Sequence, residues 1–150
     1  MIANQNGCRY GVCGLNNVRL VGYPLGQTTR GITLEKIEIL HQIIAEAVCR
    51  RPGPLIGAEI RFLRTQLGYT PEQLGNLIDQ PTDTIRVVEL DRRHLDIESD
   101  IELRRLISRH YEAPTPPLED LRSLYRLGQV GEHVIRIVAN DTENFWALAA

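Results

Sequence analysis

The sequence is poor in aromatic residues, in cysteine and in long apolar runs. Aromatic side chains make up 5% of the 150 residues, so a packed core has to consist mainly of Leu, Ile and Val. Glu and Arg interrupt every hydrophobic stretch, which excludes a membrane-spanning helix. The first residues lack the charged and apolar blocks of a signal peptide, so we expect a cytoplasmic protein with no membrane contact. Cys8, Cys13 and Cys49 are an odd set, which argues against a disulfide scaffold.

Residue combinations that perform catalysis or bind cofactors are also missing. No Ser/His/Asp set, phosphate-binding Gly-rich loop or paired-carboxylate motif rises above chance. Cys8 and Cys13 form a single pair, whereas tetrahedral zinc needs four ligands, so His41 and Cys49 would have to be recruited by the fold. We therefore predict no enzyme activity, no cofactor and no metal site.

The charge of the chain is close to neutral overall and unevenly distributed. The formal net charge is -2. Residues 50–94 carry seven Arg against six acidic residues, whereas residues 95–150 carry six Arg against ten acidic residues. Lys36 is the only lysine, and Arg suits bidentate contacts to phosphate or guanine. This weak polarity favours the middle of the chain as the place of any nucleic-acid contact.

Hydrophobic periodicity predicts a mainly α protein (α+β) with short terminal β-strands. The segments that we expect are an irregular N-terminal segment with one strand-like run, an amphipathic helix, a helical domain, and a helix followed by a β-hairpin, over residues 1–33, 34–50, 55–111 and 118–150 respectively. In the last segment, residues 133–138 alternate as a strand does, Asn140 and Asp141 offer turn chemistry, and residues 145–148 are the expected partner strand.

The helical domain opens with three short helices, predicted over residues 57–67, over 71–78, and from the cap Thr82 to about residue 90, before a fourth over 100–110. Thr70 to Gln73 form a helix start with a capping residue, Pro at the first helical position and a capping-box Gln. Thr82 is the expected cap of the third helix, which turns Ile85 and Val88 inward.

Two helices joined by a tight turn are typical of the helix-turn-helix motif, in which the second helix enters the major groove of DNA. Arg86 is the only cation on the predicted outward face of the third helix, so we expect it to contact a base. Arg92 and Arg93 follow the helix, where loop residues commonly meet phosphate. The candidate DNA-binding residues are Thr70, Gln73, Thr82, Asp83, Thr84, Arg86, Val87, Arg92 and Arg93.

These residues also carry a resemblance to a known family. Residues 55–93 resemble the Cro/repressor-type helix-turn-helix domain and, more narrowly, the C-terminal half of MqsA-type antitoxins and regulators. The matching features are Gly57, the helix start Glu59–Arg64, Leu67–Thr70, the Leu40–His41 pair and the Pro-Gly-Pro linker. The resemblance covers residues 40–107 and implies a five-helix Cro/repressor-like core and double-stranded DNA as a partner.

The chain departs from the family pattern on the third helix. The family usually has Arg-Trp-Glu at the end of this helix and a Gly shortly after it, where this chain has Val87-Val88-Glu89 and Asp91. The four-cysteine zinc site of the family is absent, and Asp83 adds a negative charge close to where phosphate would lie. We expect the fold to tolerate these changes and DNA affinity to be reduced, because phosphate contacts supply much of it.

Two functional hypotheses follow. The first is a sequence-specific transcriptional regulator, a homodimeric repressor that binds paired half-sites. The second is an antitoxin subunit or protein-interaction module with a degenerate helix-turn-helix. Its partner would be a small toxin protein, bound through residues 1–48 or through the acidic region after Leu95.

Overall fold

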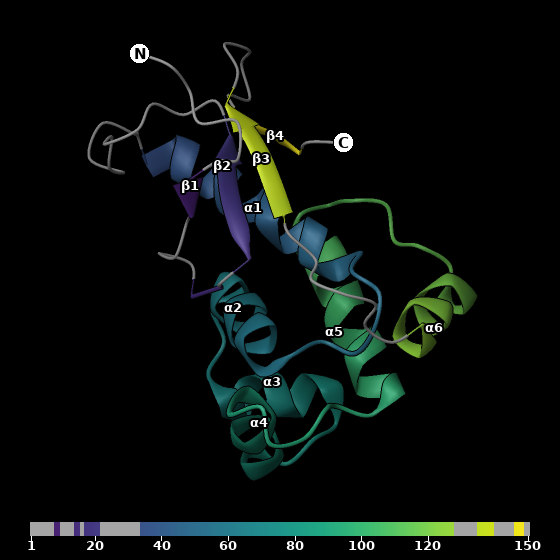
Figure 1. Cartoon of the computed structure of the whole chain (residues 1–150). Helices are drawn as coiled ribbons and strands as arrows, with labels where there is room; N and C mark the ends of the chain where they lie inside the picture. The colour runs from purple at the N-terminus through teal and green to yellow at the C-terminus, as the bar shows by residue number, and fades with distance from the viewer. Residues whose placement is uncertain are drawn as a thin grey trace. The chain divides into compact units, whose positions relative to one another are not determined.

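The structure is a computed structural model of the whole chain (Figure 1), and it describes residues 8–9, 14–15, 17–21, 34–127, 135–139 and 146–148. These residues form six helices and four short strands, so the mainly helical character was predicted correctly. The chain folds as two compact units, Val48–Gly131 and a second unit made of Met1–Ala47 and Glu132–Ala150. Cys13, Asn140 and Asp141, which the sequence analysis singled out, lie outside the described residues.

The strands form one four-stranded sheet in the order β1-β2-β3-β4, with bounds Cys8–Arg9, Val18–Val21, Ile135–Ala139 and Trp146–Leu148. β1 and β2 are antiparallel, as are β3 and β4, whereas β2 and β3 are parallel, with Val18 opposite Ile135. The sequence predicted the strand run at 18–21 and a C-terminal strand pair, but not their joining. Hence the predicted segment 118–150 is divided, and its strands belong to the unit that contains β2.

Helix α1 (Leu34–Cys49) shows the amphipathic pattern expected of it. Leu40 and Ile44 are fully buried, whereas Ile37 and Ala47 are half-buried. Ala45 is buried instead, so the apolar stripe is rotated relative to the predicted one. Leu15, Val18 and Ile135 join Leu40, Ile44 and Ala45 as buried apolar side chains among the described residues of the discontinuous unit.

The unit Val48–Gly131 contains helices α2 to α6, with bounds Gly57–Leu67, Pro71–Ile78, Thr82–Glu89, Ile97–His110 and Leu118–Arg126. The predicted ends of α2, α3 and α4 are correct to within one residue. Helix α5 begins three residues earlier than predicted, after Asp96. Helix α2 packs against α4 and α5, and α6 packs against α5 (Figure 1).

Aliphatic side chains dominate the core of this unit, as the scarcity of aromatics predicts. The buried apolar residues include Leu55, Ile60, Phe62, Leu63, Leu74, Ile78, Ile85, Val88, Leu95, Ile101, Leu103, Ile107 and Leu121. Phe62 is the only aromatic residue among them. None of the helices within the described ranges is long and apolar enough to cross a membrane.

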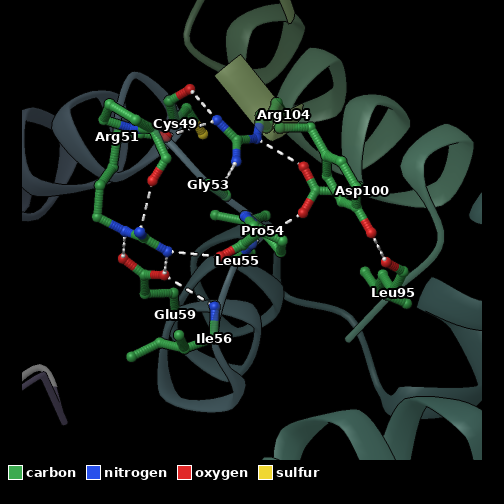
Figure 2. A network of polar contacts seen from close by, with 12 residues as sticks. Cys49, Arg51, Gly53, Pro54, Leu55, Ile56, Glu59, Leu95, Asp100 and Arg104 are labelled. Atoms are coloured by element: carbon green, nitrogen blue, oxygen red, sulfur yellow. Dashed lines mark hydrogen bonds and ion pairs between the residues drawn. The ribbon is translucent and has the colours of Figure 1, made fainter. Parts of the chain in front are cut away.

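The linker between α1 and α2, residues 50–56, is held by two buried arginines rather than lying free on the surface (Figure 2). Arg51 donates from Nη1 and Nη2 to the carbonyl oxygens of Pro52 and Pro54, both at 2.7 Å. Its Nε and Nη2 also contact the two carboxylate oxygens of Glu59, at 2.7 and 2.5 Å. Glu59 in turn accepts from the Ile56 N–H at 2.9 Å, so the ion pair also caps the start of α2.

Arg104 of α5 binds three carbonyl oxygens in this region that the Arg51 side chain does not contact. Its Nη1 donates to Cys49 O and Arg51 O, at 3.1 and 3.0 Å, and its Nη2 donates to Gly53 O at 2.6 Å. Its Nε donates to Asp100 Oδ1 at 2.7 Å, while Asp100 Oδ2 accepts from the Leu55 N–H at 2.9 Å.

Consecutive linker carbonyls from residue 51 to residue 54 thus alternate between the two guanidiniums. The Gly53 N–H donates to Leu124 O of α6 at 2.7 Å, which ties the same segment to a third helix. A backbone without regular structure can be buried only if its polar groups are paired, and these contacts supply the pairs.

Burial raises the pKa of Asp100 above its ordinary value of 3.8, and the Arg104 charge and the Leu55 hydrogen bond oppose that rise. A carboxyl group with a raised pKa in the folded state contributes its full stability below pH 3.8 and loses it as the pH rises through the folded pKa. Because the Arg104 charge lowers the pKa of Asp100, its removal raises the folded-state pKa further. The pH range between 3.8 and the folded-state pKa, over which stability is lost, then becomes wider.

We predict that Arg104→Met lowers the free energy of unfolding by about 3–5 kcal/mol at neutral pH, because a buried carboxylate and three carbonyls lose their partner. The matched control Arg105→Met, whose half-exposed side chain lies 3.6 Å from Glu102, costs at most about 0.5 kcal/mol. Urea denaturation at pH 7 and below pH 4 measures both. The Arg104→Met deficit should shrink in acid; equal losses in the two variants, or a deficit independent of pH, would contradict this account.

Candidate nucleic-acid interface

Helix α3 begins with the capping box that the sequence predicts. Thr70 Oγ1 accepts from the Gln73 N–H at 3.2 Å, and Gln73 Oε1 accepts from the Thr70 N–H at 2.9 Å. Pro71 occupies the first helical position, where its missing N–H costs nothing. Thr70 and Gln73 are both exposed, so these two candidate residues lie at the N-terminus of α3 with their side-chain oxygens engaged in capping.

The turn between α3 and α4 is fixed by a close backbone approach. Asp79 ends α3 in the left-handed region with φ 57°, and the Gln80 N–H donates to Gly75 O at 2.8 Å. A Cβ on Gly75 would collide with Gln80 O, so only glycine permits this tight packing. Gln80 Nε2 donates to Ser99 Oγ at 2.7 Å, which anchors the turn on α5.

Helix α2 holds the other end of α4. A Cβ on Gly57 would lie 2.6 Å from both Val88 O and Glu89 O, so the first turn of α2 touches the last carbonyls of α4 directly. Arg64 donates to both carboxylate oxygens of Glu89, at 3.0 and 2.8 Å. Buried Ile85 and Val88 complete the inward face, so α4 is fixed against α2 and α3 along its length.

The outward face of α4 carries one acid and one base, and an exposed apolar residue, Leu90, follows its last residue. Asp83, Arg86 and Leu90 are exposed at helical spacing, and Arg86 Nη1 lies 3.5 Å from Asp83 Oδ1. The side chain of Asp83 is 93% exposed and that of Arg86 is 66% exposed, so this ion pair contributes little to stability. Either group is therefore available to a ligand. Leu90, which is 64% exposed, was not predicted as a site residue.

The remaining candidates on α4 flank this stripe. Thr82, Thr84 and Val87 are half-buried. The prediction that Thr82 caps α4 is wrong: Pro81 is the N-cap residue, no side chain caps the helix, and Thr82 is its first helical residue. A hydrogen bond from the cap requires the residue before the first turn, and proline has no side-chain acceptor to offer there.

Arg92 and Arg93 follow α4 in a short loop and are both exposed. Neither guanidinium forms an ion pair or side-chain hydrogen bond with another residue in the described part of the chain. The structure therefore brings these two candidates to the C-terminal end of α4, next to Leu90, with their charges open to solvent.

The basic surface is smaller than the count of arginines in the sequence suggests. Arg51 is buried against Glu59, and Arg64 is largely buried against Glu89. Between residues 70 and 94, three arginines face five carboxylates. Electrostatic attraction for phosphate is accordingly confined to Arg86, Arg92 and Arg93 in this stretch, and we expect modest affinity for nucleic acid.

No group of three or more potential metal ligands occurs among the residues that the structure describes. His41 and Cys49 both lie on α1, eight residues apart, which places them on the order of 12 Å apart along the helix axis. A separation of this size along the helix is too long for one zinc ion to be bound by both side chains. Burial also lowers the pKa of His41.

We predict that Gly75→Ala lowers the free energy of unfolding by about 1–3 kcal/mol, because Gln80 has to move away from the new methyl group. Helix propensity alone predicts the opposite, a gain of about 1 kcal/mol. Asn76→Ala, at the adjacent exposed position of α3, is the control and should leave stability within about 0.5 kcal/mol. Thermal denaturation followed by circular dichroism decides: a Gly75→Ala protein as stable as the wild type would show that the turn is not tightly packed.

Comparison of the chain with protein-family models, with curated proteins and with solved structures found no match. The functional interpretation of this surface therefore depends on the arrangement of α2, α3 and α4 and on the chemistry of the residues that α4 exposes.

Proposed function

We propose that this protein is a sequence-specific, double-stranded DNA-binding regulator with a Cro/repressor-like helix-turn-helix core, acting as a homodimeric repressor. Helix α4 is the recognition helix and enters the major groove. The observation that carries the proposal is the way α4 is held: α2 and α3 fix its inner face, while Asp83, Arg86 and Leu90 project outward.

The dimensions of α4 suit this role. An α-helix with its side chains is about 10–12 Å in diameter, which fits the major groove, about 12 Å wide, and the eight residues of α4 give it a length of about 12 Å in the groove. A single domain of this size covers one half-site, so a dimer is expected to bind two half-sites about 34 Å apart.

In this proposal each candidate residue has a role that follows from its side-chain chemistry. Arg86 donates to guanine O6 and N7, Asp83 accepts from cytosine N4, and the methyl groups of Thr84 and Val87 contact thymine. Thr70, Gln73 and Thr82 approach the backbone from the N-terminal ends of α3 and α4. Arg92 and Arg93 contact phosphates beyond the end of α4.

A second function is favoured by a different observation. Five carboxylates after Leu95 are exposed in the helical unit, namely Asp96, Glu98, Glu112, Glu119 and Asp120. Exposed acid of this kind complements the basic surface of an RNA-cleaving toxin, so an antitoxin or interaction module is the alternative. The exposed Leu90 and Leu77 are compatible with such a protein contact.

We predict that Arg86→Ala weakens binding to the preferred duplex by about 1–3 kcal/mol, roughly 5- to 150-fold, because one bidentate base contact is lost. The preferred duplex is obtained by selection from a random library with the full-length protein, and affinity is measured by fluorescence anisotropy. Arg126→Ala, which removes an exposed charge from α6, is the control for net charge.

The Arg126→Ala protein should bind like the wild type. If selection enriches no sequence, or if both variants lose affinity equally, α4 does not read bases. The interaction module then becomes the better account of the exposed residues.

A further inference from the structure

Asp91 occupies a special position at the end of α4. Its backbone is left-handed, with φ 62°, a conformation that Asp tolerates better than most residues. The Asp91 N–H donates to Val88 O at 3.0 Å, and Asp91 Oδ1 accepts from the Gly57 N–H at 3.2 Å. The residue therefore closes α4 with its backbone and reaches the first turn of α2 with its side chain.

The loop that follows Asp91 is also held against the end of α4. The Arg92 N–H donates to Val87 O at 3.3 Å, so Arg92 is attached to α4 directly behind Asp91. Gly57 lies so close to the end of α4 that a Cβ would sit 2.9 Å from the Asp91 nitrogen. Both the backbone and the carboxylate of Asp91 thus lie against Gly57, in the first turn of α2.

A carboxylate next to two solvent-exposed guanidiniums is unfavourable for phosphate binding on charge alone. Asp91 nevertheless forms no side-chain ion pair with Arg92 or Arg93 in the structure, and its carboxylate is directed to a backbone N–H at a helix N-terminus.

We propose that Asp91 is a positioning residue for DNA binding: its bond to Gly57 fixes the loop so that Arg92 and Arg93 reach the phosphate backbone while α4 lies in the groove. This inference rests on the proposed function. It adds to it a residue that does not itself touch DNA, and a link between α2 and the phosphate contacts.

The test compares two neutral variants, Asp91→Asn and Asp91→Gly. Both tolerate the left-handed conformation and both remove the charge, but only Asn keeps an acceptor oxygen for the Gly57 N–H. Affinity for the selected duplex is measured between 50 and 200 mM salt, where each phosphate contact contributes about 3.5-fold to the fall in affinity. Amide hydrogen exchange of Gly57, Arg92 and Arg93 is measured on the free proteins.

Asp91→Asn is expected to keep the salt dependence of the wild type and the protection of the Gly57 amide. Asp91→Gly is expected to lose that protection and one or two phosphate contacts. The total fall in its affinity between 50 and 200 mM salt should then be about 3.5- to 12-fold smaller than that of the wild type. If the two variants bind with equal affinity and equal salt dependence while the wild type binds selectively, the positioning role is wrong and the regulator stands. If the wild type itself shows no selective binding, the proposed function fails and the positioning role fails with it.

Discussion

Two buried guanidiniums hold residues 49–55, and the placement of the first turn of α2 depends on them. Arg51 and Arg104 alternate along the linker carbonyls, while their carboxylate partners Glu59 and Asp100 accept the N–H groups at the start of α2 and just before it. Buried charges are tolerated only when they are paired and hydrogen-bonded, and here each pair also satisfies backbone groups. The ion pairs thus allow an irregular Pro- and Gly-rich segment to lie inside the helical unit.

The position of α2 then sets the position of α4. Gly57 in the first turn of α2 touches the end of α4, and Arg64, two turns later, binds Glu89. At the N-terminal end of α4, Gly75 of α3 lies equally close to the backbone of Gln80, in the turn between α3 and α4. An outward helix with so few residues can read DNA only if its orientation is fixed, because recognition depends on which side chains reach the base edges.

The sequence predicted the parts of this arrangement that depend on local chemistry. The capping box at Thr70, the bounds of α3 and the inward Ile85 and Val88 follow from residues within one or two turns of each other. The ion pairs of Arg51 and Arg104 and the pairing of β2 with β3 were not predicted, because they join residues that are distant in sequence or that read as solvent-exposed charge. For the same reason the sequence suggests that Arg51 belongs to the basic surface, whereas the fold buries it.

The most direct test of the account is an NMR titration of the isotope-labelled full-length protein with its selected duplex, following the backbone amides. If α4 enters the major groove, the largest chemical-shift changes fall on residues 82–93, with smaller ones at the N-terminus of α3, and α6 remains unaffected. Changes confined to α5 and α6, or none at all in the presence of a saturating duplex, would contradict the assignment of α4 as a recognition helix.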